Sequence, residues 1–406
     1  MRMETSYIED NWDDKAFALF IEEHLHDNVA MLRLKKWKPL PFPVDLAITQ
    51  IETRKKLSVK LPSIYNKIIV PSQIAAEQCS SEATAIYKQK LVEGQSLCDL
   101  TGGMGIDIYF MSATVEQAVY VEQNELYCHI ASRNFSALGR NNIYIINDDC
   151  VEYIRRIDKH FDTIFIDPAR RDKQNGRVYA LRECSPDVIS ILQPILDKCN
   201  RLIIKASTMA DITQIRKELG DHIRCDIHIV SVRNECKEIL VVIDSDNSCE
   251  NGIVCAMIDK DGKTVTCRFH HDIEENLPYQ LADKVLSYIY EPDAALLKSG
   301  MYKSISEQYN LSKLHKNSHL YTSDSYCPQF PGRCFEVIEV LPFASKVCRS
   351  IAKKYSLCNV STRNFPLSSA QLKEKLGVKD GGDIYLFATT DVHNSHIMII
   401  GKKDSE

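Results

Sequence analysis

The chain of 406 residues exceeds one ordinary domain of about 100 to 200 residues, so we expect two or three domains. Its formal net charge of −5 excludes a general attraction to nucleic acid, and any such partner must be met by local basic patches. The 15 cysteines include no Cys-x-x-Cys pair, and no apolar run of about 18 residues is present, which predicts a cytoplasmic protein with reduced thiols, no metal site and no membrane segment.

Residues 1–73 should form a helical N-terminal region. Helical periodicity is present from Phe17 to Trp37, and a proline-rich bend and a basic run around Arg54 to Lys60 follow it. We expect a further helix from Ile74 to Leu91, within which Ser80 and Ser81 are suited to cap the turn that begins at Glu82.

A glycine-rich turn comes next, directly after the short apolar run from Leu97 to Leu100. Its three glycines let the backbone turn tightly and approach a ligand, and Ile106 to Ser112 should begin a helix. The following strand ends in Glu122, which lies 20 residues after Gly102. An acid at that place is suited to bind ribose hydroxyls in a doubly wound sheet.

The turn does not have the spacing of a dinucleotide site. If Gly103 and Gly105 began the dinucleotide fingerprint, its third glycine position would hold Ile108. Asp99 would repel a pyrophosphate, whereas it suits an ammonium or sulfonium group. Because S-adenosylmethionine (SAM) carries no phosphate, the turn favours SAM over NAD as the cofactor. The predicted cofactor residues here are Asp99, Thr101, Gly102, Gly103, Gly105 and Glu122.

From residue 95 to about 245, apolar runs alternate with helical segments as parallel βα units require. Two adjacent runs without a helix between them, Cys225 to Arg233 and Lys237 to Asp244, predict a closing hairpin with an antiparallel last strand. The pattern predicts an α/β fold with the Rossmann-like sheet of a class I methyltransferase over residues 74–246, complete near Asp246.

Two further strand ends carry acids where ligands of open α/β sheets bind. Asp148 or Asp149 could accept a hydrogen bond from the adenine amine, although either could instead cap the next helix. Asp167 and Pro168 stand where amino-directed methyltransferases have Asp or Asn before proline. We expect Asp167 to orient a substrate amine for in-line methyl transfer, with a simple strand-ending turn as the alternative.

The polar loop from Arg170 to Tyr179 follows this strand end. Arg170 and Arg171 either bind a substrate phosphate or are solvated loop residues. For Lys205, at the next strand end, substrate contact and plain solvent exposure are both open.

The C-terminal part of the chain reads as two α+β modules. Strands at 253–260 and 264–271 and a helix near Pro278 to Tyr290 define a small module over residues 250–330. Residues 331–406 follow the order βαβαββ. This unit contains no catalytic constellation, which favours a binding or architectural role.

Seven segments give the chain a family resemblance: SSEATAIYK, DLTGGMGID, VEQN, FIDPARR, IIKASTMADI, YEPDAALLKSG and VSTRNFP. They resemble class I SAM-dependent methyltransferases with a THUMP-like C-terminal domain, and most closely the Bacteroidetes members in which a ferredoxin-like module precedes that domain. The resemblance covers roughly residues 75–400. It implies methylation of structured RNA, such as tRNA or rRNA, with the C-terminal domain assisting substrate docking.

One position departs from the amino-methylating relatives. They usually carry a stacking aromatic residue two places after the proline of the Asp-Pro pair, where this chain has Arg170. Base stacking from that position is therefore lost, and the target atom stays open. The alternatives are a SAM-dependent enzyme acting on a small molecule or protein, a non-catalytic RNA-binding protein, and a dehydrogenase. The sequence gives no indication of oligomeric state.

Overall fold

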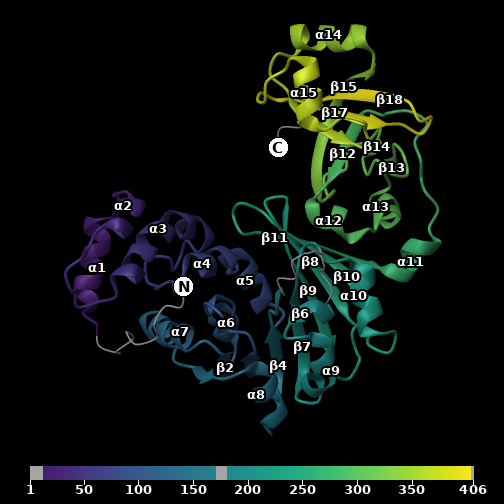
Figure 1. Ribbon diagram of the computed structural model, residues 1–406. Helices are drawn as coiled ribbons and strands as arrows, with labels where there is room; N and C mark the ends of the chain where they lie inside the picture. Colours follow the sequence, from purple (N-terminus) through teal and green to yellow (C-terminus); the bar gives the residue numbers. More distant parts are fainter. Residues whose placement is uncertain (1–11, 171–180, 404–406) are drawn as a thin grey trace. The chain divides into compact units, whose positions relative to one another are not determined.

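The computed structural model describes residues 12–170 and 181–403 (Figure 1). The chain divides into two compact units, one comprising 1–225 and 238–250 and the other 226–237 and 251–406. Across the described ranges, no helix is both long and apolar enough to cross a membrane.

The first unit begins with five helices, whose starts are fixed by side-chain caps in most cases. Asp13, Asn28, Ser72 and Ser81 each accept backbone N–H groups at the first turn of a helix. The helices are α1 (Asp14–Glu23), α2 (Val29–Leu34), α3 (Val44–Lys60), α4 (Gln73–Gln78) and α5 (Glu82–Gln89).

The prediction of one helix from Ile74 to Leu91 was wrong, because the chain breaks between α4 and α5. Cys79 has a ψ of 154°, which takes the backbone out of the helix. Ser81 then caps α5, as predicted, but the hydroxyl of Ser80 donates to Asp107 instead of capping. The break brings Ser80 to the sheet of this unit.

The sheet of the first unit has the strand order β9-β7-β4-β1-β2-β3. Neighbouring strands are parallel except β9, which runs antiparallel to β7. The strands are β1 (Ser96–Asp99), β2 (Gln117–Glu122), β3 (Ile143–Asn147), β4 (Phe161–Ile166), β7 (Cys199–Ala206) and β9 (Glu235–Asp244). This is the predicted Rossmann-like sheet, and its order reverses at β1, which lies between β2 and β4.

Helices connect these strands as the alternating pattern predicts. They are α6 (Ile106–Met111), α7 (Glu125–Ala137), α8 (Cys150–Arg156), α9 (Val188–Leu196) and α10 (Ile212–Leu219), with short 3-10 turns at Ser112–Thr114 and Leu181–Glu183. After β4, the two-residue strands β5 (Ala169–Arg170) and β6 (Cys184–Ser185) pair antiparallel.

The second unit begins with three strands in the order β11-β10-β8. They are β8 (Asp226–Val232), β10 (Gly252–Ile258) and β11 (Thr264–His270). The sequence analysis placed β8 in the closing hairpin of the predicted sheet. Since β10 lies beyond Asp246 and pairs in parallel with β8, the expectation that this sheet is complete near Asp246 was wrong. The two buried faces of β10 explain why its whole sequence is apolar.

A second sheet in this unit has the order β13-β14-β12-β15-β18-β17-β16. Its strands are β12 (Tyr288–Pro292), β13 (Ser312–Lys313), β14 (Tyr321–Ser323), β15 (Gly332–Pro342), β16 (Asn359–Arg363), β17 (Ile384–Thr390) and β18 (His396–Lys403). The helices of the unit are α11 (His271–Asn276), α12 (Ala294–Ser299), α13 (Tyr302–Tyr309), α14 (Ser345–Lys354) and α15 (Ser369–Leu376).

The predicted βαβαββ order from residue 331 is confirmed by β15 to β18 with α14 and α15. The helix predicted near Pro278 to Tyr290 is absent, and Tyr288–Pro292 forms β12 instead. Ile289 and Tyr290 are consecutive and both fully buried. Consecutive strand residues point to opposite faces, so both faces of the sheet are covered at β12, which lies between β14 and β15.

Candidate functional site

The glycine turn joins β1 to α6 and is tied to the end of β2 by hydrogen bonds. Gly102 N donates to Val121 O at 2.8 Å, and Gly103 N donates to Glu122 Oε2 at 2.9 Å. The hydroxyl of Tyr120 donates to Gly103 O at 2.6 Å. Glu122 therefore holds the turn in place from the neighbouring strand.

Packing explains two of the three glycines. A Cβ at Gly102 would lie 2.2 Å from the ring of Tyr120, and one at Gly105 would lie 2.8 Å from the ring of Phe135. Gly103 has a φ of +53°, and the nearest atom to its missing Cβ is 3.8 Å away. Of the three glycines, Gly103 is thus the one that leaves room for a ligand.

Glu122 keeps hydrogen-bonding capacity after it has fixed the turn. Its Oε2 accepts from Gly103 N, and its Oε1 accepts from Asn124 N at 2.8 Å. Each carboxylate oxygen has two lone pairs, so each can accept one further hydrogen bond. Two adjacent hydroxyls of a ribose are a donor pair that fits this capacity.

Asp99 ends β1 and is only 1% exposed. Burial raises its pKa well above the ordinary value, against the effect of the hydrogen bond that Thr101 N donates to Oδ1 at 3.0 Å. A cationic group bound beside Asp99 would offset this burial and stabilise the carboxylate. The predicted role of Asp99 beside an ammonium or sulfonium group therefore fits the chemistry of the site.

The two acids after β3 are both engaged within the protein. Asp149 is exposed and caps α8, accepting from Val151 N at 2.8 Å and Glu152 N at 3.2 Å. Asp148 forms an ion pair with Arg156 at 2.5 Å. The capping alternative thus holds for Asp149, while its surface position leaves room for a hydrogen bond to an adenine amine.

Asp167 lies at the end of β4 and is fixed from two sides. Its backbone N donates to Thr101 Oγ1 at 2.6 Å, which joins this strand end to the glycine turn. Its Oδ2 accepts from Lys205 Nζ at 2.6 Å. Pro168 is buried beside it. Only the backbone of Arg170 is described, and Arg171 and most of the following polar loop lie outside the described residues.

Lys205 belongs to a buried lysine–carboxylate cluster, which excludes the plain solvent exposure considered for it above. The cluster lies at the ends of β4 and β7, against α5, α6 and β9. It consists of Lys88, Lys205, Asp107, Asp167 and Glu238 with the hydroxyl of Ser80.

Lys88 is fully buried in this cluster and lies 2.6 Å from both oxygens of Glu238 and 3.1 Å from Asp107 Oδ1. Burial alone would raise the pKa of Asp107, but Lys88 and Lys205 hold it below the ordinary value. Burial likewise would lower the pKa of Lys205, but Asp167 and Asp107 together raise it. Lys205 is therefore a cation at neutral pH.

The sequence did not indicate this cluster as a unit. Its signals are a lysine within SSEATAIYK, an acid directly after the glycine turn and Glu238 at the start of an apolar run. From the sequence alone, each of these residues would be interpreted as an ordinary surface residue. Their contact follows from the break before α5, which we had not predicted.

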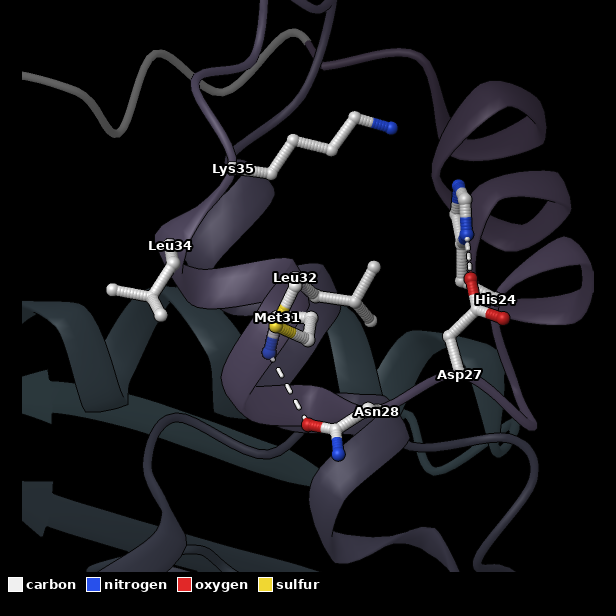
Figure 2. Close-up of a pocket in the computed structure, with 7 residues that line it drawn as sticks. All are labelled: His24, Asp27, Asn28, Met31, Leu32, Leu34 and Lys35. Atoms are coloured by element: carbon white, nitrogen blue, oxygen red, sulfur yellow. Dashed lines mark hydrogen bonds and ion pairs between the residues drawn. The ribbon is translucent and has the colours of Figure 1, made fainter.

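The described residues contain no group of three or more His, Cys, Asp or Glu side chains that could hold a metal ion. A pocket of about 490 Å³ lies between the ends of α1 and α2 (Figure 2). Its lining includes His24, whose Nδ1 is 2.6 Å from Asp27 Oδ2, and the exposed Met31 and Leu34. None of the predicted site residues lines this pocket.

Comparison with known proteins identifies the family. Residues 288–331 match the model of a ferredoxin-like domain, and residues 332–403 match a model described as THUMP domain-like. The crystal structure of a presumed methyltransferase from Porphyromonas gingivalis W83 is 31% identical, covers 97% of this chain and 100% of its own, and superposes with a TM-score of 0.86. The chain belongs to this methyltransferase family.

The chain is also similar to an uncharacterised RNA methyltransferase, MMOB5020, from Mycoplasma mobile. It is 24% identical over 149 residues, which make up 36% of this chain and 41% of the relative. The chain thus spans less than half the length of this curated relative.

Proposed function

We propose that the protein is a SAM-dependent methyltransferase that acts on structured RNA, tRNA or rRNA, in the cytoplasm. The observation that carries the proposal is the glycine turn, which Glu122 closes beside the buried Asp99 where the strand order reverses. That place is where open α/β sheets bind nucleotide-like ligands.

The residues of the first unit divide into cofactor and substrate groups. SAM supplies a methyl group on a sulfonium. The free lone pairs of Glu122 accept from the ribose hydroxyls, Asp99 and Thr101 lie beside the amino acid part, and Gly102, Gly103 and Gly105 shape the turn against it. Asp149, with Asp148 next to it, is placed to accept from the adenine amine.

Asp167 and Pro168 act on the substrate in this proposal. The structure leaves Asp167 Oδ1 without a hydrogen bond from a described residue, while Lys205 fixes Oδ2. Oδ1 can therefore orient an acceptor group for in-line transfer, a contribution of proximity and orientation that needs no covalent intermediate. Arg170 would bind a phosphate of the same substrate.

RNA as the substrate is supported by the THUMP domain-like match and by the similarity to an RNA methyltransferase. Within this proposal the chain has a helical N-terminal region at 1–73, a methyltransferase domain at 74–246, a ferredoxin-like module at 250–330 and a THUMP-like domain at 331–406. The last of these would assist docking of the RNA.

The test is methyl transfer from labelled SAM to total RNA isolated from cells that lack the gene. We expect label in one tRNA or rRNA species, and mass spectrometry of nucleosides should show one modified nucleoside missing from those cells. RNA from normal cells serves as the control, because its target is already methylated. Equal nucleoside profiles together with no labelling of either RNA would refute RNA methylation.

A further inference from the structure

A buried glutamate in the second sheet holds two arginines that come from other strands. Glu291, on β12, is 3% exposed in its side chain, and its Oε2 accepts from Arg333 Nε at 2.9 Å. Its Oε1 accepts from Arg363 Nη2 at 3.1 Å and from Ser361 Oγ at 3.2 Å. We refer to Glu291, Arg333 and Arg363 as the arginine–glutamate triad.

The triad spans the sheet. β12 and β16, which carry Glu291 and Arg363, are separated in the sheet by β15, β18 and β17. Side chains so far apart in strand order can touch only if the sheet curls, so the triad lies on its concave side. Glu291 belongs to the segment YEPDAALLKSG and Arg363 to VSTRNFP, two of the segments that carry the family resemblance.

The charges of the triad are not balanced. One arginine is enough to neutralise a buried carboxylate, as where Arg268 pairs with Asp226 at 3.0 Å elsewhere in this unit. Glu291 has two such partners, and their side chains are 36% and 38% exposed. The triad therefore presents a surplus positive charge at the surface.

Hydrogen bonds to Glu291 orient both guanidinium groups, and aromatic rings further orient that of Arg333. Arg333 lies over the rings of Phe335 and Tyr385, with 5.5 and 5.4 Å to the ring centres. Nε of Arg363 is buried and finds no acceptor among the described residues. Fixed planar guanidinium groups match the geometry of phosphate oxygens, whereas lysines provide only a point charge.

The surroundings of Arg363 are also basic. Burial, Lys313 and Arg363 together lower the pKa of His319 to about 4. Burial lowers the pKa of Lys313 to about 8, although Glu274 acts in the opposite direction. Glu274, the acid that acts on Lys313, already accepts hydrogen bonds from Lys303 N and Ser304 N.

We propose that Arg333 and Arg363 form a binding site for a backbone phosphate of the RNA substrate. The inference rests on the proposed function and adds where the RNA is held. Glu291 fixes the two guanidinium groups without neutralising both, and exposed parts of each remain to donate to phosphate oxygens. The site is located in the second unit, away in sequence from every predicted catalytic residue.

The full-length protein can be tested with bulk tRNA in a fluorescence anisotropy titration over a series of salt concentrations. Arg333→Gln and Arg363→Gln should each weaken binding about threefold to tenfold and lower the slope of log Kd against log salt by about 1. Arg268→Gln is the matched control and should change neither value. Glu291 keeps one arginine in either variant, so both should fold, and thermal unfolding checks this.

Wild-type affinity and salt slope in both folded variants would overturn the site, and the triad would then be structural. Arg363→Lys keeps the positive charge and guards against misfolding. A tRNA affinity between those of the wild type and of Arg363→Gln supports binding by the planar fork of the guanidinium, whereas wild-type affinity overturns it. If the wild type binds no tRNA, tRNA as the substrate fails separately from the phosphate site. A titration with inorganic phosphate followed by ³¹P NMR then tests the phosphate site by itself. Broadening of the phosphate signal that Arg363→Gln abolishes supports the site, and no broadening with the wild type overturns it.

Discussion

Asp99, a proposed cofactor residue, shows at the scale of one residue how burial of an acid costs stability. Burial raises its pKa, so the folded state favours the protonated form. A raised pKa contributes stability that is fully present below the ordinary value of 3.8 and is lost as pH rises through the folded-state pKa. The native protein therefore bears this cost at neutral pH, unless a cation binds next to Asp99.

We predict that Asp99→Asn increases the free energy of unfolding at pH 8 by about 1 to 3 kcal/mol, while SAM binding weakens. The gain should shrink towards pH 3, where the wild-type carboxyl is protonated in both states. Urea unfolding at a series of pH values measures it. A variant that is destabilised to the same extent at every pH would show that Asp99 is held as an ordinary structural acid.

Asp167 and Lys205 have different roles in the proposed chemistry. Since Asp167 and Asp107 keep Lys205 protonated, Lys205 cannot act as a base at neutral pH, and it instead fixes Asp167. We predict that Asp167→Ala lowers turnover about 100-fold or more, because an oriented acceptor is lost, with SAM affinity unchanged within about threefold. Methyl transfer and calorimetry measure the two effects. Turnover within a few fold of wild type would remove Asp167 from the reaction.

At the scale of elements, the break before α5 and the start of β9 bring Lys88 and Glu238 together. Lys88→Met would leave Glu238 and Asp107 buried without their shared cation, whereas Glu238→Gln leaves Lys88 paired with Asp107. We predict that Lys88→Met costs about 3 to 5 kcal/mol in the free energy of unfolding and Glu238→Gln distinctly less. Denaturant unfolding compares them. Equal costs would show that Asp107 does not share the ion pair.

The sequence predicted the elements whose signals are local. Alternation of apolar runs and helices indicated the succession of strands and helices in the first unit, and the glycine turn with Glu122 was visible because its residues lie within 20 positions of each other. The helix expected near Pro278 was wrong because neighbouring strands, not local propensity, determine β12. The lysine–carboxylate cluster and the triad were missed because their members meet only through tertiary contacts.

At the scale of the whole molecule, the pairing of strands determines where the chain can be truncated. An end at Asp246 would remove β10, which pairs with β8 from Ile227 to Val232. We predict that such a protein aggregates, because the exposed apolar edge of β8 can pair with other chains. Size-exclusion chromatography, with the full-length chain as the control, measures this. A soluble monomer that unfolds cooperatively would show that the first unit is independent of β10.

The central claim is that SAM binds at the glycine turn, and calorimetric titration with SAM tests it most directly. Glu122→Gln keeps one carbonyl oxygen for Gly103 N but loses acceptor capacity for the ribose, so affinity should fall by about 1 to 3 kcal/mol, or about 5-fold to 150-fold. Glu125→Gln, which alters a 73% exposed acid three residues away, should bind SAM like the wild type. No SAM binding by the wild type, or equal binding by Glu122→Gln, would contradict the account.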